Sequence, residues 1–537
     1  MRTSLALSLV VASAVVGCGS SSHAPPAAAS DSGTVVDDAP ELTFDADHVD
    51  IAPPPDPNAR AFDDVKLFME EELARNGVPG GAIAVVLDGK LAFSGGVGVK
   101  KAGESDPITA DSLFRVGSIT KMVLAETVLT YVEEGKLDLK KPVTDYVPWF
   151  TRGSGSDASK VTIWNLLTHT SGIPDDLQMH CPVTIGTIKQ AFVGDPSAPL
   201  WSPSGRLYNY SNMGYSLAAA ILEETQKQPF GELMEARVMK PAGMATATWD
   251  PKVALAADHA VGHNIDPTTH KPVKFYEPTS YDCAMLRAPG GIFASVIDYA
   301  HYAEHLLAGG KGVVKPETIA AMQGKQFDMH EFGESYGYGF ITWDRDGLQV
   351  VAHDGLVWGY TTVVYTIPSK NFAVVLFLNS DWIYAPWPVA ERAVEKFLGV
   401  PRPKAKVWTT PESEWGKYLG EFDASSSSLG LMDVTANSAG FLRMSMPAIG
   451  GGDLAMRQDG GDAWSVVLPA PNGPLNGTFW FDDAGKVEYF ATRAGVGRYT
   501  GPPPTPASPT MKPSTADLPV FKAETRPRVG ITAPFFP

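Results

Sequence analysis

The 537-residue chain contains only three cysteines, Cys18, Cys181 and Cys283. A small fold held together by several disulfides is therefore excluded, and none of the three cysteines has the spacing of a zinc site. If the chain is exported, Cys181 and Cys283 meet an oxidising compartment in which they could pair. The sequence does not give the distance between them, so this disulfide is a hypothesis and two free thiols are the alternative.

Positive charge is also scarce. Lysine and arginine total 43 against 60 aspartates and glutamates, which gives a formal net charge of -17. Binding to nucleic acid needs a basic surface that neutralises phosphates. We therefore expect no nucleic-acid partner.

The apolar run at the start of the chain is too short to cross a membrane as a helix, which takes about 20 residues. It extends from Leu5 to Val16 after the basic Arg2, a pattern typical of an export signal. It leads into Val15-Val16-Gly17-Cys18, which resembles the lipobox of bacterial lipoproteins. This resemblance implies a lipoprotein signal peptide over residues 1–18 and a lipid on Cys18. We expect a chain that is exported and lipid-anchored on the periplasmic side of the envelope, in the outer membrane if the cell is Gram-negative. An ordinary cleaved signal peptide is the alternative.

Four stretches that differ in composition and hydrophobic pattern follow. Residues 19–58 are rich in Ser, Ala, Pro and Asp, which predicts a disordered tether. Helical and strand patterns alternate over residues 59–400, with a helix predicted from Phe62 to Leu73 and strands over Ala82–Leu87, Tyr360–Ile367 and Phe372–Leu378. Residues 412–500 consist of short alternating segments, which predict a small β-sheet or β-barrel domain. Residues 501–537 are a Pro-rich tail.

The segment around Ser118 and Lys121 is the first that indicates chemistry. The two residues are three positions apart before an amphipathic run, so on a helix their side chains share one face and can touch. A hydroxyl at a helix start also faces unpaired N–H groups, which favour a developing anion. A lysine in an apolar pocket loses proton affinity and can then act as a base. Because such four-residue patterns occur by chance, an ordinary helix start is the alternative.

Two later segments favour a catalytic role for Ser118 and Lys121 over an ordinary helix start. Tyr208-Asn209-Tyr210-Ser211-Asn212 precedes a helical run, and His353-Asp354-Gly355 follows a predicted strand over Leu348–Val351. The ordered set S-x-x-K, Y-x-N and H-x-G resembles the serine β-lactamase and penicillin-binding-protein family over roughly residues 60–400. The tyrosine favours the branch of class C β-lactamases, D-alanyl-D-alanine carboxypeptidases, D-aminopeptidases and family VIII esterases. The segments Leu166–Gly172 and Pro289–Phe293 also look like family signatures.

The resemblance implies an α+β fold of the β-lactamase/transpeptidase type. We expect an antiparallel five-stranded sheet flanked by helices, a mostly helical subdomain beside it, and the small C-terminal β-domain. The active site would lie between the sheet and the helical subdomain.

The family pattern also implies a role for each matching residue. Ser118 is the expected nucleophile, and Lys121 and Tyr210 are expected to move its proton. Asn212 is expected to bind substrate or hold Lys121, and His353 takes the position of the lysine in the third motif. The oxyanion hole is expected from the backbone N–H groups of Ser118 and Leu356. The expected substrate and oxyanion residues are therefore Asn212, His353, Asp354, Gly355, Leu356 and Trp358.

Asp354 departs from the family pattern, because it stands where the K-T-G motif has a hydroxyl. An ionised aspartate cannot donate to a substrate carboxylate and would repel it. We therefore expect a preference for neutral esters, or for amides without a carboxylate at that position, over β-lactams. An Asp354 that points away from the substrate and pairs with a basic residue is the alternative.

His301-Tyr302-Ala303-Glu304-His305 matches the H-x-x-E-H pattern of zinc proteases. No third ligand can be identified from the sequence, so we predict no catalytic metal and no cofactor. The chain also lacks the G-x-S-x-G elbow of α/β-hydrolases.

The sequence as a whole predicts an exported serine hydrolase that forms an acyl-enzyme on Ser118. An esterase or D-amino-acid peptidase is favoured over an efficient β-lactamase, and the substrate would be a small molecule or a peptidoglycan peptide. The alternatives are a penicillin- or peptidoglycan-binding lipoprotein with slow or no turnover, and an acyltransferase. The oligomeric state is left open.

Overall fold

The computed structural model describes residues 56–503, apart from short gaps at 154–155, 176–185, 195–197, 267–268, 281, 331–332, 382–385, 403–409, 437–441, 450, 467 and 469–474. The expected signal peptide with Cys18, all but the last three residues of the tether, Cys181, and residues 504–537 of the tail lie outside the described residues. These predictions therefore stay predictions.

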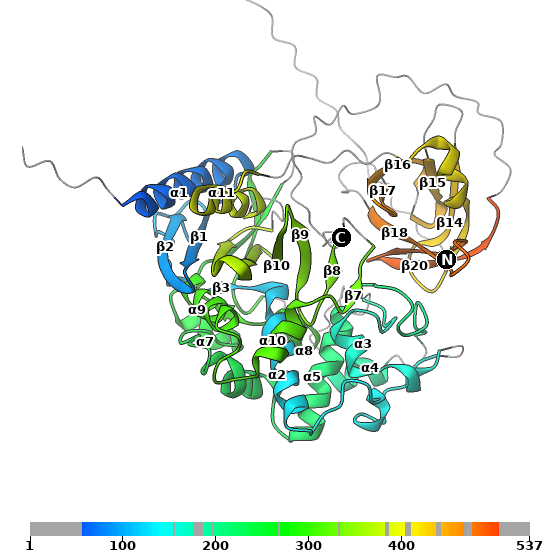
Figure 1. Cartoon of the computed structure of the whole chain (residues 1–537), viewed down its shortest axis with the longest axis horizontal. Helices are drawn as coiled ribbons and strands as arrows, with labels where there is room; N and C mark the ends of the chain where they lie inside the picture. Colours follow the sequence, from blue (N-terminus) through cyan, green and yellow to red (C-terminus); the bar gives the residue numbers. More distant parts are fainter. Residues whose placement is uncertain are drawn as a thin grey trace, which may run out of the picture. The chain divides into compact units, whose positions relative to one another are not determined.

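An antiparallel sheet is the centre of the first domain (Figure 1). Among the described residues it has eight strands, where five are expected. Five are long and adjacent in the sheet: β2 (Lys90–Gly98), β1 (Gly80–Leu87), β12 (Phe372–Leu378), β11 (Tyr360–Ile367) and β10 (Leu348–Val357). Three shorter ones extend the edge: β9 (Ile341–Arg345), β8 (Ser335–Tyr336) and β7 (Phe327–Asp328). Two-residue strands have no alternation to detect, so the sequence predicts the class of sheet and not its width.

The central strands are apolar on both faces because helices cover both. In β1, Ala82 and Ala84 belong to one core, whereas Ile83 and Val85 belong to the other. Helices α1 (Pro57–Asn76) and α11 (Pro386–Leu398) pack on each other and on one face, and α9 (Val296–Leu307) packs on the opposite face. This two-sided burial explains why β11 and β12 read as continuous apolar runs.

The β1–β2 turn and the first helix agree with the sequence. Asp88 and Gly89 both have positive φ, of 51° and 73°, as a two-residue hairpin turn with right-handed strand twist requires. Asp56 caps α1 by accepting from the backbone N–H of Asn58 at 2.9 Å. The predicted helix over Phe62–Leu73 lies within α1.

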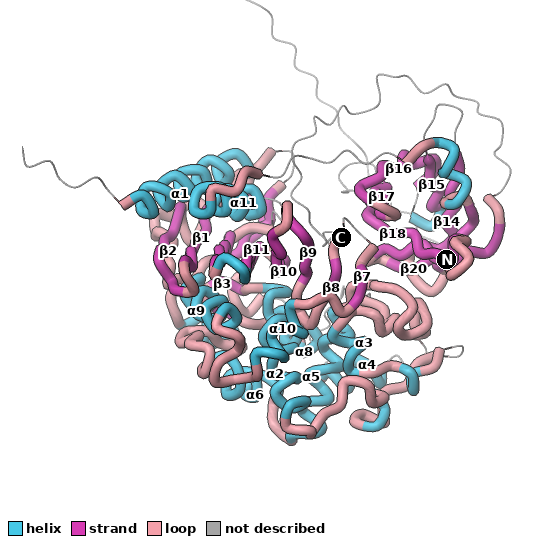
Figure 2. The backbone as a smooth tube through the Cα atoms, viewed as in Figure 1, coloured by secondary structure: helices cyan, strands magenta, loops and turns pink. Residues whose placement is uncertain are grey.

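The helical part of this domain lies beyond one end of the sheet (Figure 2). Its central helices are α2 (Thr120–Glu133), α5 (Asn212–Gln226) and α8 (Ala284–Gly290), which contact one another. Around them lie α3 (Ile163–Leu167), α4 (Ile188–Gly194), α6 (Phe230–Met234), a π-helical turn over Glu235–Met239, α7 (Pro251–Ala256) and α10 (Pro316–Gln323). Two small antiparallel pairs complete the domain: β3 (Phe114–Arg115) with β6 (Phe293–Ala294), and β4 (Gly262–Ile265) with β5 (Pro272–Tyr276).

The C-terminal β-rich region is a closed antiparallel barrel. Its strands follow chain order: β13 (Gly420–Ala424), β14 (Gly430–Ala436), β15 (Leu442–Met446), β16 (Gly451–Gly460), β17 (Ala463–Val466), β18 (Leu475–Phe481), β19 (Val487–Thr492) and β20 (Gly495–Gly501). Closure leaves no strand edge unpaired. The interior is filled by buried side chains, among them Phe422, Met444, Trp464 and Phe479.

The outer face of the barrel is attached to the sheet domain through β18, β19 and β20. Trp480 and Tyr489 belong to the same apolar core as Trp201 and Tyr208. Arg206 forms an ion pair with Glu488. The two domains therefore share a buried interface.

None of the helices in the described part of the chain is long and apolar enough to cross a membrane.

Candidate functional site

The turn that carries Ser118 stands between β3 and α2. It is one 3-10 turn over Gly117–Ile119, and the chain then continues into α2. Ser118 is half-buried, whereas Lys121, one turn further, has no exposed surface. Lys121 Nζ and Ser118 Oγ are joined by a hydrogen bond at 3.0 Å. The structure therefore brings the expected nucleophile and its base together.

Two further hydrogen bonds orient the Lys121 amine. Its nitrogen lies 2.7 Å from Oδ1 of Asn212 and 3.1 Å from the carbonyl oxygen of Pro289, both of which can only accept. When the amine is neutral, its two N–H groups satisfy these oxygens and its lone pair is directed at the Ser118 hydroxyl. Burial holds the pKa of Lys121 well below its ordinary value, and the cationic Arg493 nearby lowers it further. The amine can therefore accept the serine proton.

The second motif begins helix α5. Ser211 caps the helix by accepting from the backbone N–H of Gly214 at 3.1 Å. The cap places Asn212 at the first helical position, with its side chain toward Lys121. Tyr210, just before the cap, is buried, and its ring centroid lies 4.8 Å from Lys121 Nζ. The first two motifs therefore converge on one site.

The hydroxyl of Tyr210 is buried, and its polar neighbour is the Ser118 hydroxyl. Burial raises the pKa of Tyr210 well above its ordinary value, while the charge of Arg493 and a hydrogen bond with the Ser118 hydroxyl act in the opposite direction. The phenol is therefore in its neutral form at rest. It is placed to exchange a proton with Ser118 and the reacting groups.

His169, in the family-like segment Leu166–Gly172, supports this tyrosine. Its ring stacks on that of Tyr210 at 4.1 Å, and its Nδ1 accepts the backbone N–H of Ser211 at 3.0 Å. Its Nε2 lies 3.2 Å from the hydroxyl of Tyr336. Burial keeps the pKa of His169 well below its ordinary value, so the ring is neutral. It therefore acts on the site by positioning Tyr210 and Ser211.

The third motif lies inside β10, not after it. Gly355 allows this strand to approach the nucleophile turn: a Cβ there would lie 2.1 Å from the Val116 carbonyl oxygen and 3.1 Å from the Ser118 backbone nitrogen. The Thr362 hydroxyl of β11 donates to the same carbonyl at 2.7 Å. Ser118 and Leu356 both line one small pocket, together with Asn212, Leu286 and Pro289 among others. The backbone N–H groups of Ser118 and Leu356 are thus available as the expected oxyanion hole.

His353 does not carry the positive charge of a third-motif lysine. Its side chain is fully buried and does not line the pocket. Its Nε2 lies 3.0 Å from the Tyr336 hydroxyl, and its Nδ1 lies 2.6 Å from the Asp354 carbonyl oxygen. Burial and the nearby Lys121 together lower the pKa of His353 to about 3. The ring is therefore uncharged at neutral pH.

Asp354 is also buried and does not line the pocket. Neither of its carboxyl oxygens has a hydrogen-bond partner among the described residues. Burial raises the pKa of Asp354 to about 7, because a desolvated carboxyl group resists ionisation. The buried position of Asp354 favours the alternative in which its side chain faces away from the substrate. Trp358, in the turn after β10, is half-buried against the core and does not line the pocket either.

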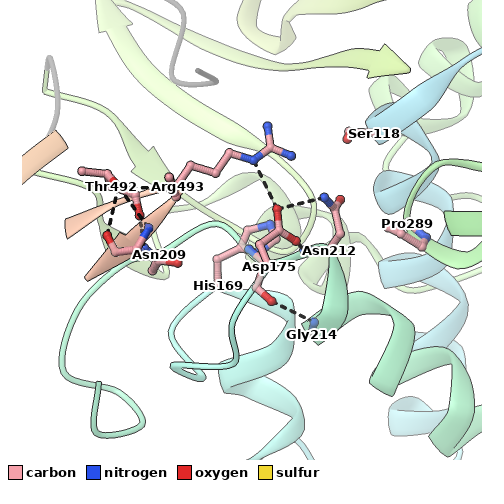
Figure 3. Close-up of polar contacts among 12 residues, drawn as sticks. Ser118, His169, Asp175, Asn209, Asn212, Gly214, Pro289, Thr492 and Arg493 are labelled. Atoms are coloured by element: carbon pink, nitrogen blue, oxygen red, sulfur yellow. Dashed lines mark hydrogen bonds and ion pairs between the residues drawn. The ribbon is translucent and has the colours of Figure 1, made fainter. Parts of the chain in front are cut away.

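Arg493 is the pocket residue that sequence reasoning missed. It lies in the turn between β19 and β20 of the barrel and lines the pocket together with Ser118, Asn212, Leu286 and Pro289. Figure 3 shows its side chain directed at Asp175, whose carboxylate is 3.3 Å from Arg493 Nε. The guanidinium carbon is 4.7 Å from the Tyr210 ring centroid. Because 318 positions separate Arg493 from Asp175, no local pattern indicates the contact.

Comparison with known proteins agrees with this geometry. The family model described as Beta-lactamase matches residues 65–395. The chain belongs to the beta-lactamase family.

Three proteins similar to this chain are described next. Protein Flp of Staphylococcus aureus (strain MW2) is 24% identical over 336 residues, which are 60% of this chain and 64% of Flp. The octameric penicillin-binding protein homologue from Pyrococcus abyssi has a TM-score of 0.59 at 25% identity, over 81% of this chain and 99% of that one. The D-amino acid amidase of Ochrobactrum anthropi SV3, solved with D-phenylalanine, has a TM-score of 0.54 at 22% identity, over 63% and 99%. The chain thus spans about two thirds of the length of Flp, and its fold occurs in penicillin-binding-protein homologues and in a hydrolase.

The H-x-x-E-H segment of this beta-lactamase-family chain lies on α9, and its two histidines have different partners. His305 Nε2 lies 2.6 Å from the buried carboxylate of Glu126 on α2, whereas His301 Nδ1 lies 3.1 Å from Glu304. Within the described ranges, no three His, Cys, Asp or Glu side chains gather so as to hold a metal ion. The segment links α9 to the catalytic helix α2.

Cys283 is disulfide-bonded, at the start of α8. The expected partner, Cys181, lies outside the described residues, so the pairing remains a prediction.

Proposed function

We propose that the protein is a serine hydrolase that cleaves esters or amides through an acyl-enzyme on Ser118. The observation that carries the proposal is the buried Lys121 amine, whose nitrogen lies 3.0 Å from the hydroxyl oxygen of the half-buried Ser118. An ordinary exposed lysine, with a pKa near 10.4, stays protonated at neutral pH and cannot accept the serine proton.

The geometry supports a sequence of proton transfers. Ser118 Oγ attacks the acyl carbon while its proton passes to Lys121 Nζ. The negative oxygen of the tetrahedral intermediate lies between the backbone N–H groups of Ser118 and Leu356, where one such donor is worth about 3 kcal/mol of barrier. The leaving group takes this proton from Lys121, through the Tyr210 hydroxyl as a relay, as the C–O or C–N bond breaks, and the amine is neutral again. A water molecule then attacks the acyl-enzyme ester and gives a proton by the same route to Lys121. The amine returns this proton to the Ser118 oxygen as the bond between the acyl carbon and Ser118 breaks.

We infer that esters and D-amino-acid amides or peptides, including peptidoglycan peptides, are better substrates than β-lactams. Position 354 offers no hydroxyl to a β-lactam carboxylate, since Asp354 is buried away from the pocket. The fold similarity to a D-amino acid amidase supports the amide class.

Slow deacylation is a second candidate, and one observation favours it. The raised pKa of Tyr210, together with a neutral His353, makes the phenol a poor base for activating water. A long-lived acyl-enzyme would bind penicillins or pass its acyl group to an amine or alcohol.

The test is labelling of the purified protein with a fluorescent fluorophosphonate and a fluorescent penicillin, followed by rates on an aryl ester, a D-alanyl peptide and nitrocefin. The wild type is expected to take up the fluorophosphonate and to cleave the ester or peptide faster than nitrocefin. Ser118→Ala is expected to lose labelling and activity. Equal labelling of the two proteins would show that the nucleophile lies elsewhere. A wild type that is labelled without turnover would favour the second candidate.

We also propose that the enzyme is exported and attached to the cell envelope by a lipid on Cys18. The short apolar run and the lipobox-like Val15-Val16-Gly17-Cys18 support this proposal.

A further inference from the structure

Asp175 determines which way the Asn212 side chain faces. Its carboxylate accepts from the backbone N–H of Asn212 at 2.7 Å and from the side-chain Nδ2 at 3.2 Å. A carboxylate can only accept hydrogen bonds, so the amide nitrogen must face Asp175. The amide oxygen is then left to face Lys121, at 2.7 Å. Asp175 thereby determines that Lys121 meets an acceptor and directs its lone pair at Ser118.

The same carboxylate creates an electrostatic difficulty. Asp175 is 8% exposed, and its negative charge acts to raise the pKa of Lys121. A buried anion beside Lys121 favours the protonated amine, whereas the amine must be neutral to act as a base. Arg493 offsets that charge, because it forms an ion pair with Asp175 and itself lowers the pKa of Lys121.

The hairpin that carries Arg493 is held in place on the catalytic domain. Asn209 Nδ2, one residue before Tyr210, donates to the Thr492 carbonyl oxygen at 2.7 Å. The Thr492 hydroxyl accepts from the backbone N–H groups of Ala494 and Gly495, both at 3.1 Å, which tightens the turn. The arginine thus enters the site from a defined position (Figure 3).

The geometry points to Asp175 and Arg493 as a positioning pair, through which the docked barrel completes the active site. Asp175 orients Asn212 toward Lys121. Arg493 supplies a positive charge that offsets the charge of this carboxylate, so that Lys121 can stay neutral. The inference rests on the proposed function of Ser118 and extends it to the barrel. Neither residue needs to touch the reacting atoms.

The charged and titratable groups around Lys121 come from several elements. Arg493 and Asp175 act on it, as does the buried Asp354 of β10, and Lys121 in turn lowers the pKa of His169 and of His353. The rings of Tyr210 and Tyr215 lie 4.8 and 5.6 Å from its nitrogen. Both histidines are neutral because burial lowers their pKa values. Arg493 is therefore the cation whose removal should most change the proton affinity of Lys121.

The experiment compares the pH dependence of fluorophosphonate labelling and of ester hydrolysis in four full-length proteins: wild type, Arg493→Gln, Arg493→Lys and Glu488→Gln. Arg493→Gln should raise the pKa of Lys121, so the rising limb of the rate profile should move by about one pH unit to higher pH, with a roughly tenfold or greater loss of kcat at pH 7. Arg493→Lys keeps the charge and should restore most of the profile. Glu488→Gln removes another ion pair of the same interface, outside the pocket, and should leave the profile unchanged.

A companion variant, Asp175→Asn, tests the orientation of Asn212. It should lower kcat more than it raises KM, because the new amide no longer selects one orientation of its neighbour. Thermal melts establish that each variant is folded.

The outcomes separate the two proposals. A wild type without Ser118-dependent labelling would overturn the proposed function itself. Normal wild-type labelling with an unshifted Arg493→Gln profile would overturn the role of the barrel. An effect of Arg493→Gln confined to KM for carboxylated substrates would also overturn it, because Arg493 would then be a substrate-binding residue. A profile shifted equally by Glu488→Gln would assign the effect to barrel docking in general.

Discussion

Buried ionisable side chains of the site lower the free energy of unfolding. Substitutions at these positions should therefore change stability and activity separately. Lys121 is buried with a lowered pKa, and Asp354 is buried with a raised pKa and without a hydrogen-bond partner among the described residues. A buried polar group without a hydrogen bond costs about 1–3 kcal/mol. Removing such a group should therefore stabilise the fold, even where it removes activity.

Tyr210→Phe should separate these two effects. The substitution removes a buried hydroxyl whose polar neighbour is the Ser118 hydroxyl, so the free energy of unfolding should change by no more than roughly 1 kcal/mol. The rate should fall by about 10²–10³-fold, because a proton-transfer group is lost. Urea unfolding and ester hydrolysis measure the two quantities. The contrasting variant Tyr215→Phe should lower stability, because the Tyr215 hydroxyl donates to the Leu167 carbonyl at 2.9 Å. A larger loss of stability in Tyr210→Phe would show that its hydroxyl has a structural partner.

Asp354→Asn should stabilise the protein in a pH-dependent way. In the unfolded chain the carboxyl ionises near the ordinary aspartate pKa of 3.8, whereas in the folded protein its pKa is about 7. Between these values the folded state binds more protons, so stability falls as pH rises from about 4 to 7, and the full penalty applies above 7. The asparagine variant avoids that penalty. We expect it to be about 2 kcal/mol more stable than the wild type at pH 8 and nearly equal to it at pH 4.

Urea unfolding at the two pH values checks this expectation, with the exposed Asp483→Asn as control. A stability gain of the same size at pH 4 and pH 8 would contradict the raised pKa.

At the scale of elements, the site depends on how closely strand β10 approaches the nucleophile turn. Sequence patterns predict β11 and β12 with their observed bounds, because both are apolar runs between turns. They predict β10 only as far as Val351, whereas the strand continues to Val357. The reason is that His353 and Asp354 are polar side chains within a buried strand, and their burial depends on partners elsewhere in the fold.

Gly355→Ala should disrupt this approach. The new methyl group would lie 2.1 Å from the Val116 carbonyl oxygen and 2.3 Å from the Thr362 hydroxyl, so the strand must move away. We expect a loss of roughly 100-fold or more in kcat/KM, because the two oxyanion N–H groups separate, and a loss of about 2 kcal/mol in stability. Gly416→Ala, at a site with no atom within 4 Å of the added carbon, should change neither. Full activity in Gly355→Ala would exclude the proposed oxyanion hole.

At the scale of the whole molecule, the barrel and the catalytic domain contact each other at several points. They share an apolar core through Trp480 and Tyr489, an ion pair through Arg206 and Glu488, and a hydrogen bond from Asn209 to Thr492. The C-terminal β-rich region is predicted by its short alternating segments, yet its contribution to the active site is not. The Pyrococcus homologue matches 81% of this chain, which is more than the catalytic domain alone.

Cys18→Ala should detach the whole molecule from the membrane. If Cys18 carries the lipid, the wild type should appear in the membrane fraction of a Gram-negative host and incorporate labelled palmitate. The variant should do neither, while keeping the same specific activity. Ser118→Ala should fractionate like the wild type. Palmitate labelling of the Cys18 variant would place the anchor elsewhere.

The sequence by itself determined the class of fold and the order of the motifs, and it indicated the residues of the proposed chemistry. These depend on short-range features: the three-residue spacing of Ser118 and Lys121, the helix cap at Ser211, and apolar runs of strand length. Only the tertiary structure decided the electrostatics of the site. The neutral His353, the buried Asp354 and the cation at Arg493 follow from burial and from a contact across 318 positions. Proton affinity depends on every charge within a few ångströms, and folding brings those charges together from segments that no local pattern connects.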